Sequence, residues 1–140
     1  MNAPFEPFHD EPALLRVPPQ SVESEMAVLG ALLLDNRAWD RIGDLLTGSD
    51  FDRYENQVVF DAVAALLNAN HGADVLTVFE HLQRTGKAGE VGGLMYLNQL
   101  AQYVPSVANV RRFAEIVRER SVLRRLVAAT DEIATAAFSP

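Results

Sequence analysis

The sequence contains no cysteine, only one lysine and no long apolar run. Without cysteine the chain can form neither a disulfide nor a zinc site that depends on thiolate ligands. The longest apolar stretch covers residues 27–34, whereas a membrane-spanning helix needs about 20 such residues. The amino terminus has no basic segment followed by an apolar stretch, so it does not resemble a secretory signal. We therefore expect a soluble cytoplasmic protein with no membrane contact.

Residue patterns for catalysis or nucleotide binding are also scarce. A phosphate-binding loop requires a lysine followed by serine or threonine, but Lys87 is followed by Ala88. The acidic residues Asp50 and Asp52 are interpreted as helix caps or solvated side chains. Three histidines lack the spacing of metal ligands: His9, His71 and His81. The sequence therefore predicts no catalytic residue, no metal site and no cofactor within this chain.

The net charge of −7 and the isoelectric point near 4.8 argue against nucleic-acid binding by the domain as a whole. Half of the 12 basic residues nevertheless lie within fifteen positions: Arg111, Arg112, Arg118, Arg120, Arg124 and Arg125. This arginine cluster has two interpretations. Its side chains either pair with Glu115 and Glu119 on a solvated helix face, or they contact single-stranded DNA.

Apolar residues at spacings of three and four predict successive helices from Ser21 onward. Ser21, Asp74 and Ser106 are placed to cap three of them. Residues 1–19 contain five of the seven prolines and are expected to form a flexible tail. The predicted fold is all-α, with a compact bundle of about five helices in residues 20–104 and one long helix in residues 105–140. The expected helices cover residues 22–34, a segment from Trp39 to Leu46, and residues 55–70, 75–85, 94–104 and 107–137.

The long carboxy-terminal helix changes character at Ser121. Before this residue, Val110, Phe113, Ala114 and Val117 form one narrow apolar stripe. Beyond it the apolar residues spread around the helix: Val122, Leu123, Leu126, Val127, Ala128, Ala129, Ile133, Ala134, Ala136, Ala137 and Phe138. A helix that is apolar on several sides is normally covered on several sides, and five other helices can cover only one. We expect a further helix or a second subunit to cover the rest; the alternative is an alanine-rich helix that tolerates exposure.

Several ordered motifs resemble the amino-terminal domain of DnaB-type bacterial replicative DNA helicases. The series starts with PPQSVESE at residues 18–25 and AVLGALLLD at residues 27–35. It continues with FDAV at residues 60–63, DVLTV at residues 74–78 and VPSVAN at residues 104–109. It closes with IVRERSVLRRLV at residues 116–127. The helicase-binding domain of primase is a similar helical bundle, but residues 18–35 favour the helicase.

The resemblance implies a non-catalytic collar domain of a ring-shaped hexameric helicase. In that family the amino-terminal domains form a trimer of dimers, partly through hairpins of two long helices, and residues 105–140 would be the first arm of such a hairpin. The implied partners are a second copy of the chain, the helicase-binding domain of primase and a helicase loader. A separate ATPase motor of the parent 5′–3′ helicase would bind ATP and magnesium and make most of the DNA contacts.

Six residues are candidates for partner contacts. Tyr96, Val127 and Ile133 are aromatic or aliphatic residues of the kind that anchor protein interfaces. Arg111, Arg118 and Arg125 are candidates for the rim of the same interface. For Tyr96 the alternative is packing within the bundle, and for the arginines it is contact with single-stranded DNA. An enzyme of another type would need a pocket lined by convergent polar groups.

Overall fold

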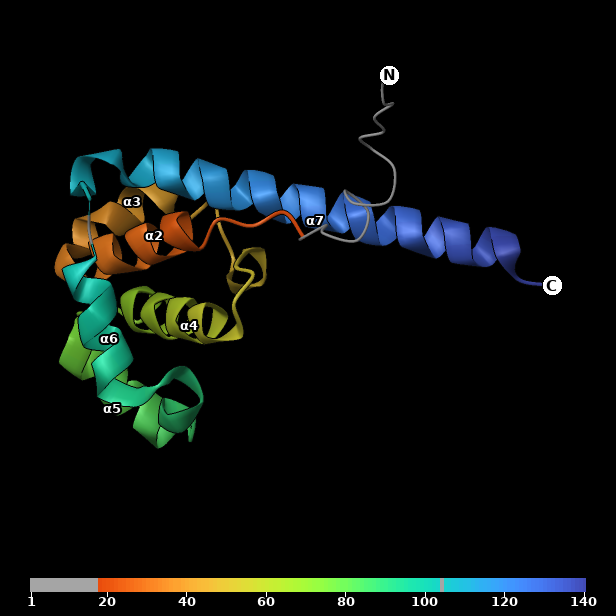
Figure 1. Cartoon of the computed structure of the whole chain (residues 1–140). Helices are drawn as coiled ribbons and strands as arrows, with labels where there is room; N and C mark the ends of the chain where they lie inside the picture. The colour runs from red at the N-terminus through yellow and green to blue at the C-terminus, as the bar shows by residue number, and fades with distance from the viewer. Residues whose placement is uncertain (1–17, 104) are drawn as a thin grey trace, which may run out of the picture.

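The structure is a computed structural model that describes residues 18–103 and 105–140. Over these residues it consists of helices joined by short loops and contains no strand, which confirms the all-α prediction (Figure 1). The α-helices are α2 (Val22–Leu34), α3 (Trp39–Ile42), α4 (Tyr54–Asn68), α5 (Val75–Arg84), α6 (Gly93–Gln102) and α7 (Val110–Phe138). Four short 3₁₀ segments join them: η1 (Asn36–Ala38), η2 (Gly48–Asp50), η3 (Ala88–Val91) and η4 (Val107–Asn109). All but the last two residues of the expected tail lie outside the described residues.

The helix ends follow the capping residues in most places. The Ser21 hydroxyl accepts a hydrogen bond from the amide of Ser24 at 3.3 Å, and the Asp74 carboxylate accepts one from the amide of Thr77 at 2.9 Å. The prediction for Ser106 is wrong, because its side chain makes no capping bond. The η4 segment follows it instead, so α7 begins at Val110 rather than at residue 107.

The second helix is shorter than expected. Only one turn, α3, forms between Trp39 and Ile42, and the chain then passes through Gly43 into a turn. Glycine lowers helix propensity, which accounts for the early end. Leu46 is nevertheless buried as its spacing predicted, so the segment contributes to the core without being helical.

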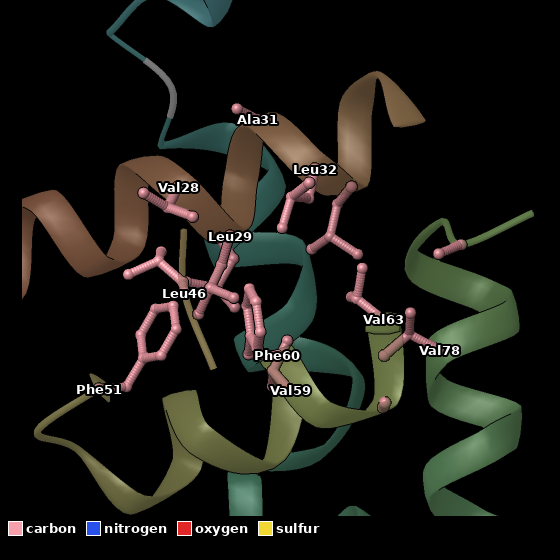
Figure 2. Packing of buried hydrophobic residues seen from close by; sticks show 14 of the residues in the cluster. Val28, Leu29, Ala31, Leu32, Leu46, Phe51, Val59, Phe60, Val63 and Val78 are labelled. Carbon is pink, nitrogen blue, oxygen red and sulfur yellow. The ribbon is translucent and has the colours of Figure 1, made fainter. Parts of the chain in front are cut away.

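The hydrophobic core is formed by α2, α4, α5, α6 and the first half of α7. Leu29 and Leu32 of α2 are fully buried and point toward Phe60 and Val63 of α4 (Figure 2). The rings of Phe51 and Phe60 lie 4.9 Å apart between their centroids. From the other side α7 contributes its own buried residues to the same cluster: Val110, Ala114 and Val117.

Among the elements that the structure describes, helix α7 alone extends beyond the helical body. It crosses the body along α2 and α3 and then projects past it toward the carboxy terminus (Figure 1). Ser121 is its last buried residue, and every residue from 122 onward is exposed except the half-buried Arg124. We call residues 110–121 the docked half and residues 122–138 the free half of α7.

Candidate functional site

The free half of α7 exposes large apolar side chains on one face. At 3.6 residues per turn, the docked face defined by Val110, Ala114, Val117 and Ser121 continues into a mainly polar surface beyond residue 121. That surface contains Arg124, Arg125, Glu132 and Thr135. The large apolar residues lie on the opposite side of the helix: Val122, Leu123, Leu126, Val127 and Ile133. We call these five residues the apolar face of α7.

The apolar face points away from the body and is open to solvent. Leu126 is 59% exposed and Ile133 is 68% exposed. Val122 and Leu123 are exposed although they directly follow the buried Ser121, which shows that the body cannot reach this side of the helix. The sequence predicts apolar residues all around the free half. Phe138, which is 91% exposed at the end of the helix, lies to one side of the apolar face, and the remaining sides carry alanines as their apolar residues.

A buried carboxylate holds α7 at the point where its two halves meet. The side chain of Asp50, at the end of η2, has no solvent exposure. Its Oδ1 atom accepts hydrogen bonds from Arg118 Nη1 at 2.9 Å, from Ser121 Oγ at 2.7 Å and from Arg125 Nη2 at 2.8 Å. Its Oδ2 atom accepts one from the amide of Thr47 at 2.8 Å. The three donors on Oδ1 occupy one side of α7, because their spacings are three and four.

Arg124 adds further contacts between α7 and the same loop. Its Nη2 donates to the main-chain oxygen of Asp50 at 2.7 Å, and its Nη1 donates to that of Pro19 at 2.8 Å. Its Nε lies 3.5 Å from the carboxylate of Asp52. We call Asp50, Arg118, Ser121, Arg124 and Arg125 the junction. It joins the loop before α4 to the middle of α7.

The environment of Asp50 favours its ionised form. Burial raises the pKa of this carboxyl, but the hydrogen bonds from the Thr47 amide, Ser121 and Arg118 lower it by more. The net result is a pKa below the ordinary value of 3.8. Asp50 is therefore negatively charged at neutral pH, which suits two guanidinium partners.

A second buried carboxylate supports the start of α4. Glu25 of α2 accepts hydrogen bonds from the amide of Asp52 at 2.7 Å and from Asn56 Nδ2 at 2.9 Å. The hydroxyl of Tyr96 in turn donates to Asn56 Oδ1, so α6 joins the same network. Burial, and next the charge of Glu55, raise the pKa of Tyr96 to about 12, which keeps the hydroxyl protonated as a donor.

Every arginine of the arginine cluster lies close to a carboxylate. Each of its six members has a carboxylate oxygen within 3.7 Å. Three use Glu115 or Glu119 on α7 itself, and three use Asp50 or Asp52. This arrangement favours the structural interpretation of the cluster over a contact with single-stranded DNA.

Hollows in the surface are small or shallow. The hollow between α4 and α5 has a volume of about 140 Å³ and is lined by residues that include Asp61, His81 and Lys87. Ligand sites usually have volumes of roughly 300–1,000 Å³. Two hollows reach this size, with volumes of about 570 Å³ and 440 Å³, but each is lined by residues of one helix only, α6 and α7 respectively. Within residues 18–103 and 105–140, no group of three or more acidic or histidine side chains is placed to hold a metal ion. In the same residues, no helix is both long and apolar enough to cross a membrane.

Comparison with known proteins identifies the family. A model of the DnaB-like helicase N-terminal domain family matches residues 17–119. The chain belongs to this family. The match confirms the resemblance seen in the motifs, and it ends close to the junction.

Individual members of the DnaB family agree with this assignment. The crystal structure of the N-terminal domain of DnaB helicase from Mycobacterium tuberculosis superposes with a TM-score of 0.86 and 36% identity, covering 89% of this chain and 90% of that one. The replicative DNA helicase DnaB of Geobacillus stearothermophilus is 42% identical over 119 residues, which cover 85% of this chain and 26% of the relative. That of Buchnera aphidicola is 38% identical over 122 residues, covering 87% and 26%. The chain thus spans about a quarter of the length of these curated relatives.

The six residues predicted from the sequence do not form one site in this DnaB-family domain. Val127 and Ile133 lie on the apolar face of α7, whereas Tyr96 is half-buried on α6, in the body. Arg118 and Arg125 lie at the junction, bound to Asp50. Arg111 donates to the main-chain oxygen of Arg41 at 2.8 Å and so connects α7 to α3. Their roles in partner contact stay predictions.

Sequence reasoning missed Asp50 and Ser121 as the centre of the junction. The capping interpretation of Asp50 describes its bond to the Thr47 amide but not its burial. The available signal was the spacing of Arg118, Ser121 and Arg125, which places three donors on one side of the helix. Spacing alone does not say which of the 19 acidic residues would meet them.

Proposed function

We propose that this domain mediates subunit assembly of a replicative DNA helicase through the free half of α7. The observation that carries the proposal is the apolar face, which contains five large side chains on the side of the helix turned away from the body. Soluble monomers rarely expose large contiguous apolar patches, and such patches usually mark an interaction site. A second copy of the chain is the proposed occupant, with a homodimer formed by this chain and a homohexamer formed by the whole protein.

We further propose that the domain docks primase at the replication fork. Support comes from membership in the DnaB family, whose relatives are named replicative DNA helicases. The body offers a second exposed apolar group on α6, where Met95 is 82% exposed next to Leu94. A helicase loader is a further proposed partner. ATP hydrolysis and unwinding would belong to the parent helicase, with ATP and magnesium bound by its motor rather than by this domain.

Assembly is tested by light scattering and sedimentation of the chain across a range of concentrations. We expect the wild-type chain to associate and Leu126→Asp to shift it to a monomer, because a carboxylate on the apolar face opposes its burial. Thr135→Asp is the matched control, since Thr135 is exposed on the opposite side of the same helix. A wild-type chain that stays monomeric at all concentrations would contradict the assembly proposal.

Primase docking is tested by titrating the chain with the carboxy-terminal domain of a bacterial primase in a calorimeter. Saturable binding that Met95→Asp weakens and Thr135→Asp leaves unchanged supports the proposal and places the contact on α6. Absence of binding to the wild-type chain under conditions in which it associates contradicts primase docking without affecting the assembly proposal.

A further inference from the structure

The junction lies where a long exposed arm leaves the body, so its geometry bears on the direction of that arm. We propose that Asp50 is a positioning residue, whose buried carboxylate binds Arg118, Ser121 and Arg125 and thereby fixes the direction and rotation of the free half of α7. Asp50 itself lies outside α7, in η2, and it contributes nothing to the apolar face.

The docked apolar segment of α7 is short compared with the arm that it supports. The buried apolar residues of α7 end at Val117, which leaves a docked apolar segment of seven residue steps, or roughly 10 Å along the helix. The free half extends about 25 Å beyond Ser121. A tilt of roughly 10° at the base would displace the end of this arm by about 4 Å. Contacts at Ser121 and Arg125 lengthen the attached segment by about 12 Å and so restrict the tilt.

The bonds to Asp50 also restrict the rotation of α7 about its axis. Apolar contacts are not directional, so Val110, Ala114 and Val117 on their own permit small rotations of α7 about its axis. Hydrogen bonds to a charged group depend on distance and angle, and bonds of 2.7–2.9 Å to one buried oxygen leave little rotational freedom. Because the apolar face lies opposite the docked side, the rotation set at the junction decides where that face points.

Asp50 is itself held in place by the body. Its second oxygen accepts from the Thr47 amide, its main-chain oxygen accepts from Arg124, and the following residue is the fully buried Phe51. Phe51 packs against Phe60 of α4 with ring centroids 4.9 Å apart. The carboxylate is therefore a fixed point of the body rather than a mobile surface charge.

The direction of the arm can be measured without reference to assembly. The chain has no native cysteine, so Gln83→Cys on α5 and Ala136→Cys on the free half, both exposed, give a single pair of spin labels. Pulsed electron resonance then reports the distance between body and arm, and an excess of unlabelled chain removes distances between copies. We expect a narrow distribution for wild type and a broader one, displaced by about 4 Å or more, for Asp50→Asn.

A second variant guards against loss of folding in Asp50→Asn. The pair Arg118→Gln and Arg125→Gln removes two of the three donors to Asp50 Oδ1 from the side of α7, where both side chains are about half exposed. It leaves the bonds of Asp50 to Ser121 and Thr47 in place. The matched control is Arg112→Gln with Arg120→Gln, which removes the same charge from arginines whose partners among the described residues are Glu115 and Glu119. Circular dichroism confirms the helical content of each variant.

The role of the arm in assembly rests on the proposed function, whereas the positioning of the arm by Asp50 does not. The possible outcomes therefore distinguish the two. A broadened distribution in the junction variants and an unchanged one in the control support a positioning role. An unchanged distribution in the folded junction variants, or an equal change in the control, overturns it. If the arm loosens while association is unaffected, Asp50 still positions the arm, but the free half of α7 is not the assembly surface.

Discussion

The two halves of α7 show that the same residue type can have opposite roles within one continuous helix. Val117 in the docked half is 1% exposed, whereas Val127 in the free half is 46% exposed, only ten positions later. Neither the helix nor the side chain changes between the two positions; the difference is whether α2 and the η2 loop lie opposite. Exposure of an apolar residue is therefore a statement about the surroundings that the rest of the chain provides.

The largest expected effect comes from placing the same charge in each half. Val117→Asp should lower the free energy of unfolding by about 4 kcal/mol or more, because it places a carboxylate among buried apolar side chains. Val127→Asp should change it by about 0.5 kcal/mol or less, since that side chain already contacts solvent. Urea unfolding of both variants, in chain diluted until it is monomeric, measures the difference. Similar losses in the two variants would show that the free half is packed.

The junction between the halves gives the next largest effect, and it depends on pH. Asp50→Asn should lower the free energy of unfolding by about 2–3 kcal/mol at pH 7, because hydrogen bonds to a charged acceptor are lost around the buried Ser121. The pKa of Asp50 is lowered in the fold, so its stabilising effect is complete above the ordinary value of 3.8 and is lost as pH falls through the lowered pKa.

The stability difference between wild type and Asp50→Asn should therefore be constant from pH 7 down to about 5 and should shrink below 3.8. Urea unfolding at a series of pH values measures it. Glu119→Gln is the control, because Glu119 pairs with exposed arginines of α7 itself. A difference that stays constant through pH 3 would contradict the ionised state assigned to Asp50.

Tyr96 tests whether the body has its own polar support, independent of α7. Tyr96→Phe should cost about 1–2 kcal/mol of unfolding free energy, since it removes the donor to Asn56 Oδ1 in the buried network around Glu25. Association of the chain should not change. A variant as stable as wild type but defective in partner binding would instead support the role predicted for Tyr96 from the sequence.

Much of the fold could be predicted from the sequence because its signals are local. Spacing placed the helices, and Ser21 and Asp74 placed two of the amino-terminal caps. The two helix boundaries that differ most from the prediction also have local causes. Gly43 ends α3 after one turn although Leu46 continues the apolar pattern, and η4 takes the place of a simple Ser106 cap.

The site was less predictable because it depends on contacts between distant residues. Asp50 and Ser121 are 71 positions apart, and no periodicity links a loop carboxylate to a helix hydroxyl. The distribution of apolar side chains around α7 was also hard to interpret. A count of all apolar residues predicts that partners cover the helix on several sides. When large side chains are considered apart from alanines, most of them share the face that contains Val127 and Ile133.

The smallest expected effect comes from glycine substitutions in α7, which test whether the free half unfolds together with the body. Ala114→Gly in the docked half should cost about 2 kcal/mol, from lost helix propensity and a lost buried methyl group. Ala129→Gly in the free half should change the global free energy by about 0.5 kcal/mol or less, because a helix end without tertiary contacts opens before the body does. Its effect should appear as faster amide hydrogen exchange beyond residue 125 and should weaken when the chain associates. Equal losses for the two glycine variants in dilute chain would mean that the junction extends the cooperative unit along the whole of α7, and the two halves would then differ in solvent exposure alone.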